Sequence, residues 1–108
     1  MTSLQVLYFL HLCGTKSISE TARQLFVAQP AVSKQIAALE RELGTELFVR
    51  TNRGVELTTA GACYYDFFSE SDRKFRRLQA ELRRAADLEQ RSLAVGILEN
   101  LGLDEVSD

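Results

Sequence analysis

Apolar residues in the first part of the chain recur at helical intervals and predict two short helices. Between residues 6 and 13 they stand three or four positions apart, and Gly14 then favours the end of a helix. Ser17 and Glu20 have capping-box spacing, in which a serine hydroxyl and a glutamate carboxylate satisfy free N–H groups at a helix start. A second helix is therefore expected over about residues 18–26. Its apolar positions share one side and are Ile18, Ala22, Leu25 and Phe26.

The third predicted helix has two faces of different character. Pro30 suits a first helical turn and Gly44 a C-terminal cap, which predicts a helix over residues 29–43. At about 100° per residue, one face is apolar and the other carries small or hydrogen-bonding side chains. The apolar face comprises Val32, Ile36, Leu39 and Leu43, and the free face comprises Pro30, Ser33, Lys34, Ala37 and Arg41. The first eleven residues of this helix include Lys34 and no acid.

Two interpretations fit the free face of this helix. Taken alone, a polar outer face is typical of an amphipathic helix packed in an all-α bundle. A helix that enters the major groove of DNA also needs slim side chains, hydrogen-bonding groups for base edges and few negative charges near phosphates. Gln29, Ser33 and Lys34 meet these needs. Glu40 and Glu42 lie at the far end of the helix, away from the half expected to read bases.

A change of pattern after the third helix predicts a small β-hairpin. Residues 47–50 and 55–58 are β-prone and flank a turn-rich tip at 51–54. Arg50 would end the first strand, where it suits a phosphate contact, and Arg53 would lie at the tip, where it suits a minor groove. Alone, two solvated arginines in a turn would explain the same residues. The order of short helix, turn, proline-started helix and hairpin favours a winged helix-turn-helix.

A long helix with a regular seam is predicted after the hairpin. Thr58 suits an N-cap, and no proline follows it as far as about Leu88, which gives roughly 31 residues and about 46 Å of helix. Seven positions alternate four and three residues apart, the spacing of a coiled-coil seam. They are Tyr64, Phe68, Ser71, Phe75, Leu78, Leu82 and Ala85. Such a seam needs a partner helix, so we expect two copies to pair here. A further strand is predicted at 93–98.

Composition indicates one small globular domain with an appendage. The 108 residues are 45% apolar and 26% charged, close to globular averages. No apolar run nears the roughly 18 residues that cross a bilayer, and no signal peptide is evident, so we expect a cytoplasmic protein without a membrane partner. The formal net charge of −2 disfavours DNA binding. Residues 1–88, however, hold 12 of the 13 bases and 10 of the 15 acids, a balance of +2, so the acidity belongs mostly to the tail.

The chain offers little material for catalysis or for metal binding. Cys13 and Cys63 each stand among apolar neighbours at helical spacing, which favours two small buried side chains over a disulfide or a metal site. His11 is the only histidine, and neither a carboxylate pair nor a nucleophile accompanies it. We therefore expect neither an enzyme nor a cofactor.

Many separated segments of the chain match one known family in both residues and spacing. They are Tyr8-Phe9, Ser17-Ile18, Ala22 with Leu25, the run from Val27 to Ile36, Leu39-Glu40, Leu43-Gly44, Leu47-Phe48, Arg50-Thr51, Leu57-Thr58 and Ala60-Gly61. With these segments the chain resembles the N-terminal part of LysR-type transcriptional regulators over about residues 4–98. An ordered series of this kind is far more specific than one isolated motif.

The resemblance implies a mainly α fold and a division of the chain into three parts. Residues 1–58 correspond to a winged helix-turn-helix DNA-binding domain of three helices and a two-stranded wing, with the helix-turn-helix at about 18–37. Residues 59–90 correspond to the family's long linker helix, which pairs two subunits. Residues 91–108 correspond to the start of an effector-binding domain, which is then missing from this chain.

The resemblance also implies contacts and partners. The residues that correspond to DNA contacts are Gln29, Pro30, Ser33, Lys34, Arg50, Thr51 and Arg53, with Thr51 the least direct of them. The partners implied are double-stranded DNA and a second copy of the chain, and tetramer formation by the full-length protein is left open. A small-molecule co-inducer would act only through the missing effector domain.

Two departures from the family's pattern and one other function stay open. Ala28 stands where a serine that would cap the third helix is frequent, and an N-cap alanine typically costs about 0.5–2 kcal/mol. Thr21 replaces a frequent alanine and indicates a small adjustment in packing. The same fold could instead serve only dimerisation or capture of a partner protein, which the negative net charge favours.

Overall fold

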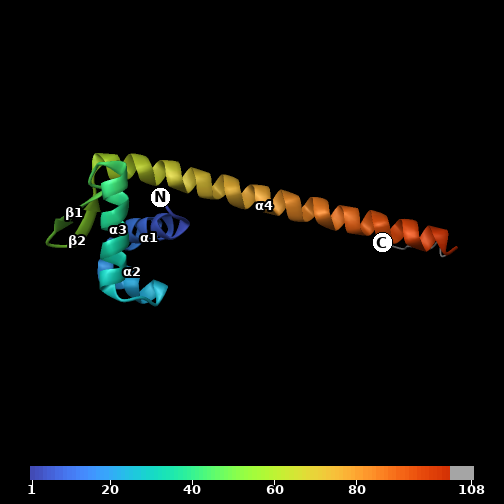
Figure 1. Ribbon diagram of the computed structural model, residues 1–108, viewed down its shortest axis with the longest axis horizontal. Coiled ribbons are helices and arrows are strands. Elements are labelled where there is room, and N and C mark those ends of the chain that lie inside the picture. The colour runs from blue at the N-terminus through green and yellow to red at the C-terminus, as the bar shows by residue number, and fades with distance from the viewer. Residues whose placement is uncertain (103–108) are drawn as a thin grey trace. The chain divides into compact units, whose positions relative to one another are not determined.

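The structure is a computed structural model that describes residues 1–102 (Figure 1). Its elements are α1 (Ser3–Thr15), α2 (Ile18–Leu25), α3 (Gln29–Leu43), β1 (Phe48–Thr51), β2 (Gly54–Leu57) and α4 (Thr59–Asn100). They form two compact units, of which the first spans Met1–Ser71 and the second begins at Asp72. The fold is therefore mainly helical with a two-stranded antiparallel hairpin, which confirms the predicted fold class.

The first helix ends later than its glycine suggested. α1 begins at the N-cap Thr2, whose hydroxyl accepts from the backbone N–H of Gln5 at 3.1 Å. Its C-cap is Lys16, in the left-handed conformation with φ 56°, and the Lys16 N–H donates to the Leu12 carbonyl at 2.8 Å. The predicted end at Gly14 is wrong, because this bond keeps Gly14 within the last helical turn.

The second helix starts as predicted but completes only half of its capping box. The Ser17 hydroxyl accepts from the Glu20 N–H at 3.1 Å, whereas the Ser17 N–H donates to the Thr15 hydroxyl at 3.2 Å instead of to Glu20. The Glu20 carboxylate pairs with Arg23 one turn further along. This hydrogen bond lowers the pKa of the Glu20 carboxyl, because it stabilises the charged form.

The third helix has the predicted bounds, and Gly44 caps it with φ 71°. Its N-cap Ala28 makes no side-chain hydrogen bond, as the departure from the family's pattern indicated. The apolar face lies inward as predicted, since Val32 and Leu39 are fully buried. The core of the first unit consists of Tyr8, Phe9, Leu12, Cys13, Ala22, Val32, Ile36, Leu39, Leu47, Val55 and Phe68. Thr21 is also fully buried, and its hydroxyl lies 2.7 Å from that of Thr15.

The hairpin forms one residue later in the chain than predicted for its first strand. β1 and β2 are antiparallel, with Phe48 opposite Leu57 and Thr51 opposite Gly54. Asn52 and Arg53 make the turn, and Figure 1 shows the two strands extending beyond the helices as a wing.

Gly54 brings the wing into contact with the end of α1. It has φ 126°, and a Cβ there would lie 2.4 Å from the Lys16 carbonyl oxygen. The same oxygen accepts from the Val55 N–H at 3.1 Å. The end of β2 nearest the wing's tip is therefore bonded to the α1–α2 turn, and only glycine fits beside this bond.

The start of α4 belongs to the first unit. The Thr58 hydroxyl accepts from the Gly61 N–H at 2.9 Å and donates to the Glu46 carbonyl at 2.6 Å, which confirms the predicted cap. A Cβ on Gly61 would lie 2.1 Å from the Leu47 carbonyl oxygen, so a glycine is needed for this close approach. Cys63 is exposed, whereas the buried residues of α4 are Gly61 and Phe68, so the prediction that Cys63 is buried is wrong.

The strand predicted at 93–98 is also wrong, because α4 continues through these residues to Asn100. A lone strand would leave its backbone N–H and C=O groups without a neighbouring strand, whereas a helix bonds them internally. Within residues 1–102, no helix combines the length and the apolar character that crossing a membrane requires.

Candidate nucleic-acid interface

The first turns of α3 carry four of the predicted DNA-contact residues. Gln29, Pro30 and Lys34 are exposed, and Ser33 is half-buried between them. Gln29 and Ser33 are one turn apart on the helix, as are Pro30 and Lys34, so all four lie at its N-terminal end. Pro30 removes no helical hydrogen bond there, because N–H groups of the first turn have no partner within a helix.

The wing presents two arginines beside a structured turn. Arg50 is exposed on β1 opposite Val55, and Arg53 is exposed at the tip. Thr51 is half-buried, and its hydroxyl accepts from the Arg53 N–H at 3.2 Å. The structure thus gives Thr51 a part in shaping the turn that carries Arg53.

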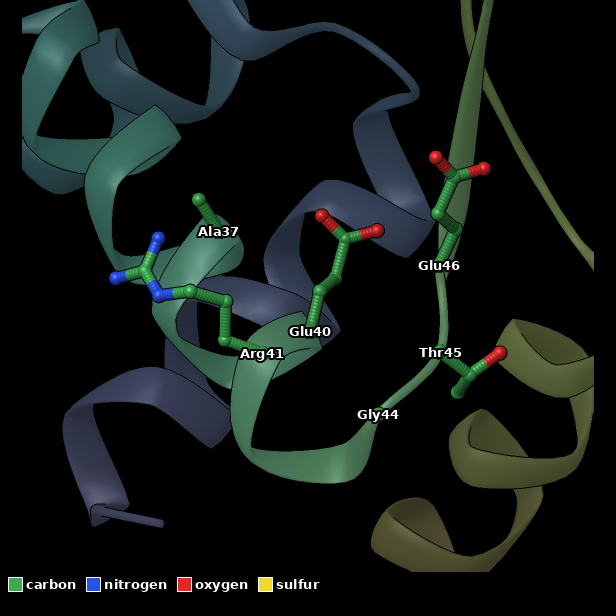
Figure 2. A pocket seen from close by; sticks show the side chains of 6 residues that line it. All are labelled: Ala37, Glu40, Arg41, Gly44, Thr45 and Glu46. Carbon is green, nitrogen blue, oxygen red and sulfur yellow. The ribbon is translucent and has the colours of Figure 1, made fainter.

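Glu40 joins α3 to the wing, a role that sequence reasoning missed. Its Oε2 accepts from the Leu47 N–H at 2.7 Å and from the Phe48 N–H at 3.4 Å, at the start of β1. Figure 2 shows this side chain rising from α3 toward the segment that leads to Glu46. From the sequence, Glu40 was expected to lie away from DNA, with no contact to the hairpin predicted for it. Its membership of the matched Leu39-Glu40 pair was the available signal.

A shallow hollow lies at the C-terminal end of α3, around the same glutamate (Figure 2). It is lined by Ala37, Glu40, Arg41, Gly44, Thr45 and Glu46. None of the predicted DNA contacts lines it, and its Glu40 carboxylate is already bonded to the wing. We therefore interpret this hollow as part of the junction between α3 and the hairpin, and not as a binding site.

Phe26 occupies an unexpected position between α2 and α3. The sequence pattern placed it on the apolar side of the second helix, but α2 ends at Leu25 and the Phe26 side chain is 94% exposed. Its backbone is left-handed, with φ 57° and ψ 43°. This conformation costs about 1–2 kcal/mol in a non-glycine residue, and it turns the ring away from the inward face of α2. The expectation that Phe26 faces the core is wrong.

The predicted seam of α4 divides between core and surface. Phe68 is buried against Phe9, with ring centroids 5.7 Å apart, and Tyr64 stacks on Phe68 at 5.8 Å. Phe68 thus belongs to the core of its own chain, and the half-buried Tyr64 packs against that core. The other five seam residues, Ser71, Phe75, Leu78, Leu82 and Ala85, are exposed. Pairing through them stays a prediction.

Within residues 1–102, no group of three or more His, Cys, Asp or Glu side chains is placed to hold a metal ion. Cys13 is buried beside α1's apolar neighbours, and this burial raises the pKa of its thiol to about 12. The predicted contact residues Gln29, Pro30, Lys34, Arg50 and Arg53 are instead exposed, on α3 and on the wing.

A family model for "Bacterial regulatory helix-turn-helix protein, lysR family" matches residues 4–62. Among curated proteins, the regulator ClcR of Pseudomonas putida is 45% identical over 62 residues, which are 57% of this chain and 21% of that protein. A probable cat1 operon transcriptional activator of Acinetobacter lwoffii is 37% identical over 95 residues, 87% of this chain and 31% of that protein. The chain thus spans about a fifth to a third of these relatives' lengths.

Solved structures give the same similarity in three dimensions. The DNA complex of CbnR_DBD has a TM-score of 0.73 and 32% identity, covering 80% of this chain and 99% of that one. The complex of BenM_DBD with catB site 1 DNA has a TM-score of 0.74 and 30% identity, covering 80% and 97%. Full-length BenM has a TM-score of 0.68 and 30% identity, covering 74% of this chain and 26% of that one.

Proposed function

Because the chain belongs to the lysR family of bacterial regulatory helix-turn-helix proteins, we propose that it is the DNA-reading end of a transcription regulator that binds a defined duplex sequence. The observation that carries this proposal is the exposed, acid-free first part of α3 beside a wing with two exposed arginines. Two similar structures, of CbnR_DBD and BenM_DBD, are DNA complexes. The relatives named above are a transcription regulator and a probable transcription activator, and we propose that this chain likewise acts by binding DNA and not as an enzyme.

The start of α3 supplies the groups that would read bases. Gln29 offers both a donor and an acceptor, and Ser33 a hydroxyl, which suits hydrogen bonding to base edges in the major groove. Pro30 is slim enough to allow close approach, and Lys34 adds a cation for a phosphate. The first acidic residue of α3 is Glu40, and its carboxylate is hydrogen-bonded to the start of the wing.

The wing would hold the DNA backbone and the neighbouring minor groove. Arg50 lies on β1 and suits a phosphate, because its guanidinium donates in a fixed fork that matches phosphate oxygens. Arg53 lies at the tip, where an arginine can enter a narrow minor groove. Thr51, the last residue of β1, accepts a hydrogen bond from the Arg53 backbone and so supports the turn. Glu40 fixes the start of β1 to α3, so the two contact regions would approach DNA together.

A second copy of the chain would complete the binding unit. We propose that the exposed seam residues of α4 pair two chains, and that residues 59–90 act as the dimerising linker. Two start regions of α3 would then meet an inverted repeat with half-sites about 34–36 Å apart. Residues 91–108 would lead toward an effector-binding domain, through which a small-molecule co-inducer would act. The protein would work in the cytoplasm, on the chromosome.

Selection from a random duplex pool, followed by salt-dependent titration, tests the proposal. The 108-residue chain should enrich one sequence, and Gln29→Ala or Ser33→Ala should relax the preference at particular base pairs. Arg50→Ala should instead weaken binding to all sequences and reduce the salt slope by roughly one unit. Arg41→Ala is the matched control, because Arg41 lies twelve residues, about 18 Å, along α3 from Gln29.

A second candidate rests on the net charge of −2. In this alternative the fold serves only dimerisation or capture of a protein partner. The chain would then show no binding to random duplex DNA at low salt, and Lys34→Glu would change nothing. Enrichment of one sequence that Lys34→Glu abolishes would instead exclude this alternative.

A further inference from the structure

We propose that Phe26 reads DNA as well, through an apolar contact with the 5-methyl group of a thymine at the edge of the sequence that α3 reads. This inference rests on the proposed function and extends its contact surface to the turn of the helix-turn-helix. It assigns a specificity role to a side chain that neither the motif match nor the polar pattern of α3 selects.

The position of Phe26 is set by a fixed backbone. Its N–H donates to carbonyl oxygens of the preceding turn, those of Ala22 and Arg23, the latter at 3.3 Å. The next residue, Val27, donates to the Ala22 carbonyl at 3.0 Å and packs its half-buried side chain against the core. The turn is therefore anchored on both sides of the exposed ring, and the 94% exposure comes from a defined conformation.

The same turn leads directly into the proposed reading surface. Val27 faces the core, while Phe26, Ala28 and Gln29 are all exposed. Gln29 lies three positions after Phe26, so their Cα atoms are at most about 11 Å apart, or roughly three base-pair steps. When the start of α3 enters a major groove, this turn comes against the base pairs beside those that Gln29 reaches.

The chemistry of the ring selects thymine among the base edges. Phenylalanine has no hydrogen-bonding group, and the 5-methyl of thymine is the apolar feature of the major groove. An exposed aromatic ring also has a large apolar area that binding would remove from water. The nearest preceding acid, Glu20, is paired with Arg23, and no acid follows before Glu40. Because the exposed ring continues the proposed DNA-reading surface of α3, DNA is the partner that we assign to it.

The test combines ring removal with methyl removal. On the duplex selected by the parent chain, each thymine is replaced in turn by deoxyuridine, which lacks only the 5-methyl group. The protein variants are Phe26→Asn, which tolerates the left-handed backbone without a ring, and Phe26→Leu, which keeps an apolar side chain. Unfolding curves confirm that each variant stays folded.

The proposal expects coupling between the two changes. The parent should lose about three- to fivefold in affinity at one or two deoxyuridine positions flanking those read by Gln29, the effect of uncovering about one methyl group. Phe26→Asn should bind the thymine duplex more weakly by at least that factor and be indifferent to the same replacements. Phe26→Leu should retain part of the thymine preference.

Three results would overturn the proposal. Equal affinity of Phe26→Asn and the parent for every duplex would remove the ring from the DNA surface and leave it to a protein partner. A uniform loss on all duplexes, without coupling to deoxyuridine, would assign the ring to the sugar–phosphate backbone. A parent chain that enriches no sequence at all would overturn both this inference and the proposed function, whereas the first two results leave the proposed function standing.

Discussion

The Glu40 carboxylate accepts a 2.7 Å hydrogen bond from the backbone N–H of Leu47, and this bond joins α3 to the first residues of the wing. The carbonyl of Leu47 accepts in turn from the Thr58 N–H at 3.0 Å, just before α4. One fully buried residue thus connects helix, hairpin and linker through its own backbone. The orientation of the wing relative to α3 depends on these bonds.

Removing the Glu40 carboxylate should loosen the wing. Glu40→Ala leaves two backbone donors without their acceptor, so the free energy of unfolding should fall by about 1–3 kcal/mol and DNA affinity should fall with it. Glu40→Gln keeps one acceptor oxygen and should lose less. Urea unfolding and amide hydrogen exchange at Leu47 and Phe48 measure the effect. Glu42→Ala, an equal charge change on the same helix, should not speed exchange at these two amides.

Filling the space beside Gly61 should destabilise the first unit. A Cβ there meets the Leu47 carbonyl oxygen at 2.1 Å, so Gly61→Ala must displace backbone and should cost about 1–3 kcal/mol or more. Gly14→Ala is the opposite control, since nothing lies within 4 Å of its Cβ position and alanine favours a helix by about 0.5–1 kcal/mol. Thermal unfolding of both variants checks the opposite signs, and a Gly61→Ala protein as stable as the parent would contradict the contact.

Charging the exposed seam of α4 should separate the proposed dimer. Leu78→Glu puts a carboxylate into an apolar seam, so sedimentation should show monomers and affinity for an inverted repeat should fall about a hundredfold, through lost avidity. Gln79→Glu adds the same charge one position off the seam and should do neither. A Leu78→Glu monomer that binds the inverted repeat as tightly as the parent would refute the coupling between pairing and DNA reading.

The thiol of Cys13 should be inert in the folded chain. Burial raises its pKa from the ordinary value of 9.0 to about 12. In a Cys63→Ser background, alkylation near pH 8 should run at least about a hundredfold slower when folded than in urea, because the thiolate is the reacting form. The unfolded chain loses this proton at a lower pH than the folded chain, so stability should fall as the pH rises from 9 toward 12. Equal alkylation rates with and without urea would show Cys13 to be accessible.

The third helix and the hairpin were predictable because their bounds depend on neighbouring residues in the sequence. Pro30 and Gly44 set both bounds of α3, since one fits a first turn and the other a left-handed cap. The alternation of 3 and 4 residues placed Val32 and Leu39 in the core. The exposed starting residues of α3 followed from the same periodicity, as did the hairpin from its turn residues.

The errors arose where one position depends on a distant partner. Lys16 adopts a conformation typical of glycine, and its carbonyl accepts a hydrogen bond from Val55, far along the chain. The end of α1 was therefore wrongly predicted at the nearby Gly14. Phe26 looked apolar and was assigned to the core, although the turn into α3 points it outward. The stretch 93–98 is β-prone, but no second strand in the described residues pairs with it.

The contact between Gly54 and Lys16 limits how this fold can be recombined with its relatives. Exchanging residues 18–37 alone would replace the helix-turn-helix but keep the peptide groups of Lys16, Gly54 and Val55, which hold the tip end of β2. A chimaera intended to bind another regulator's operator would have to receive Met1–Ser71 as one block, because this compact unit contains both the helix-turn-helix and the residues that are bonded to the wing.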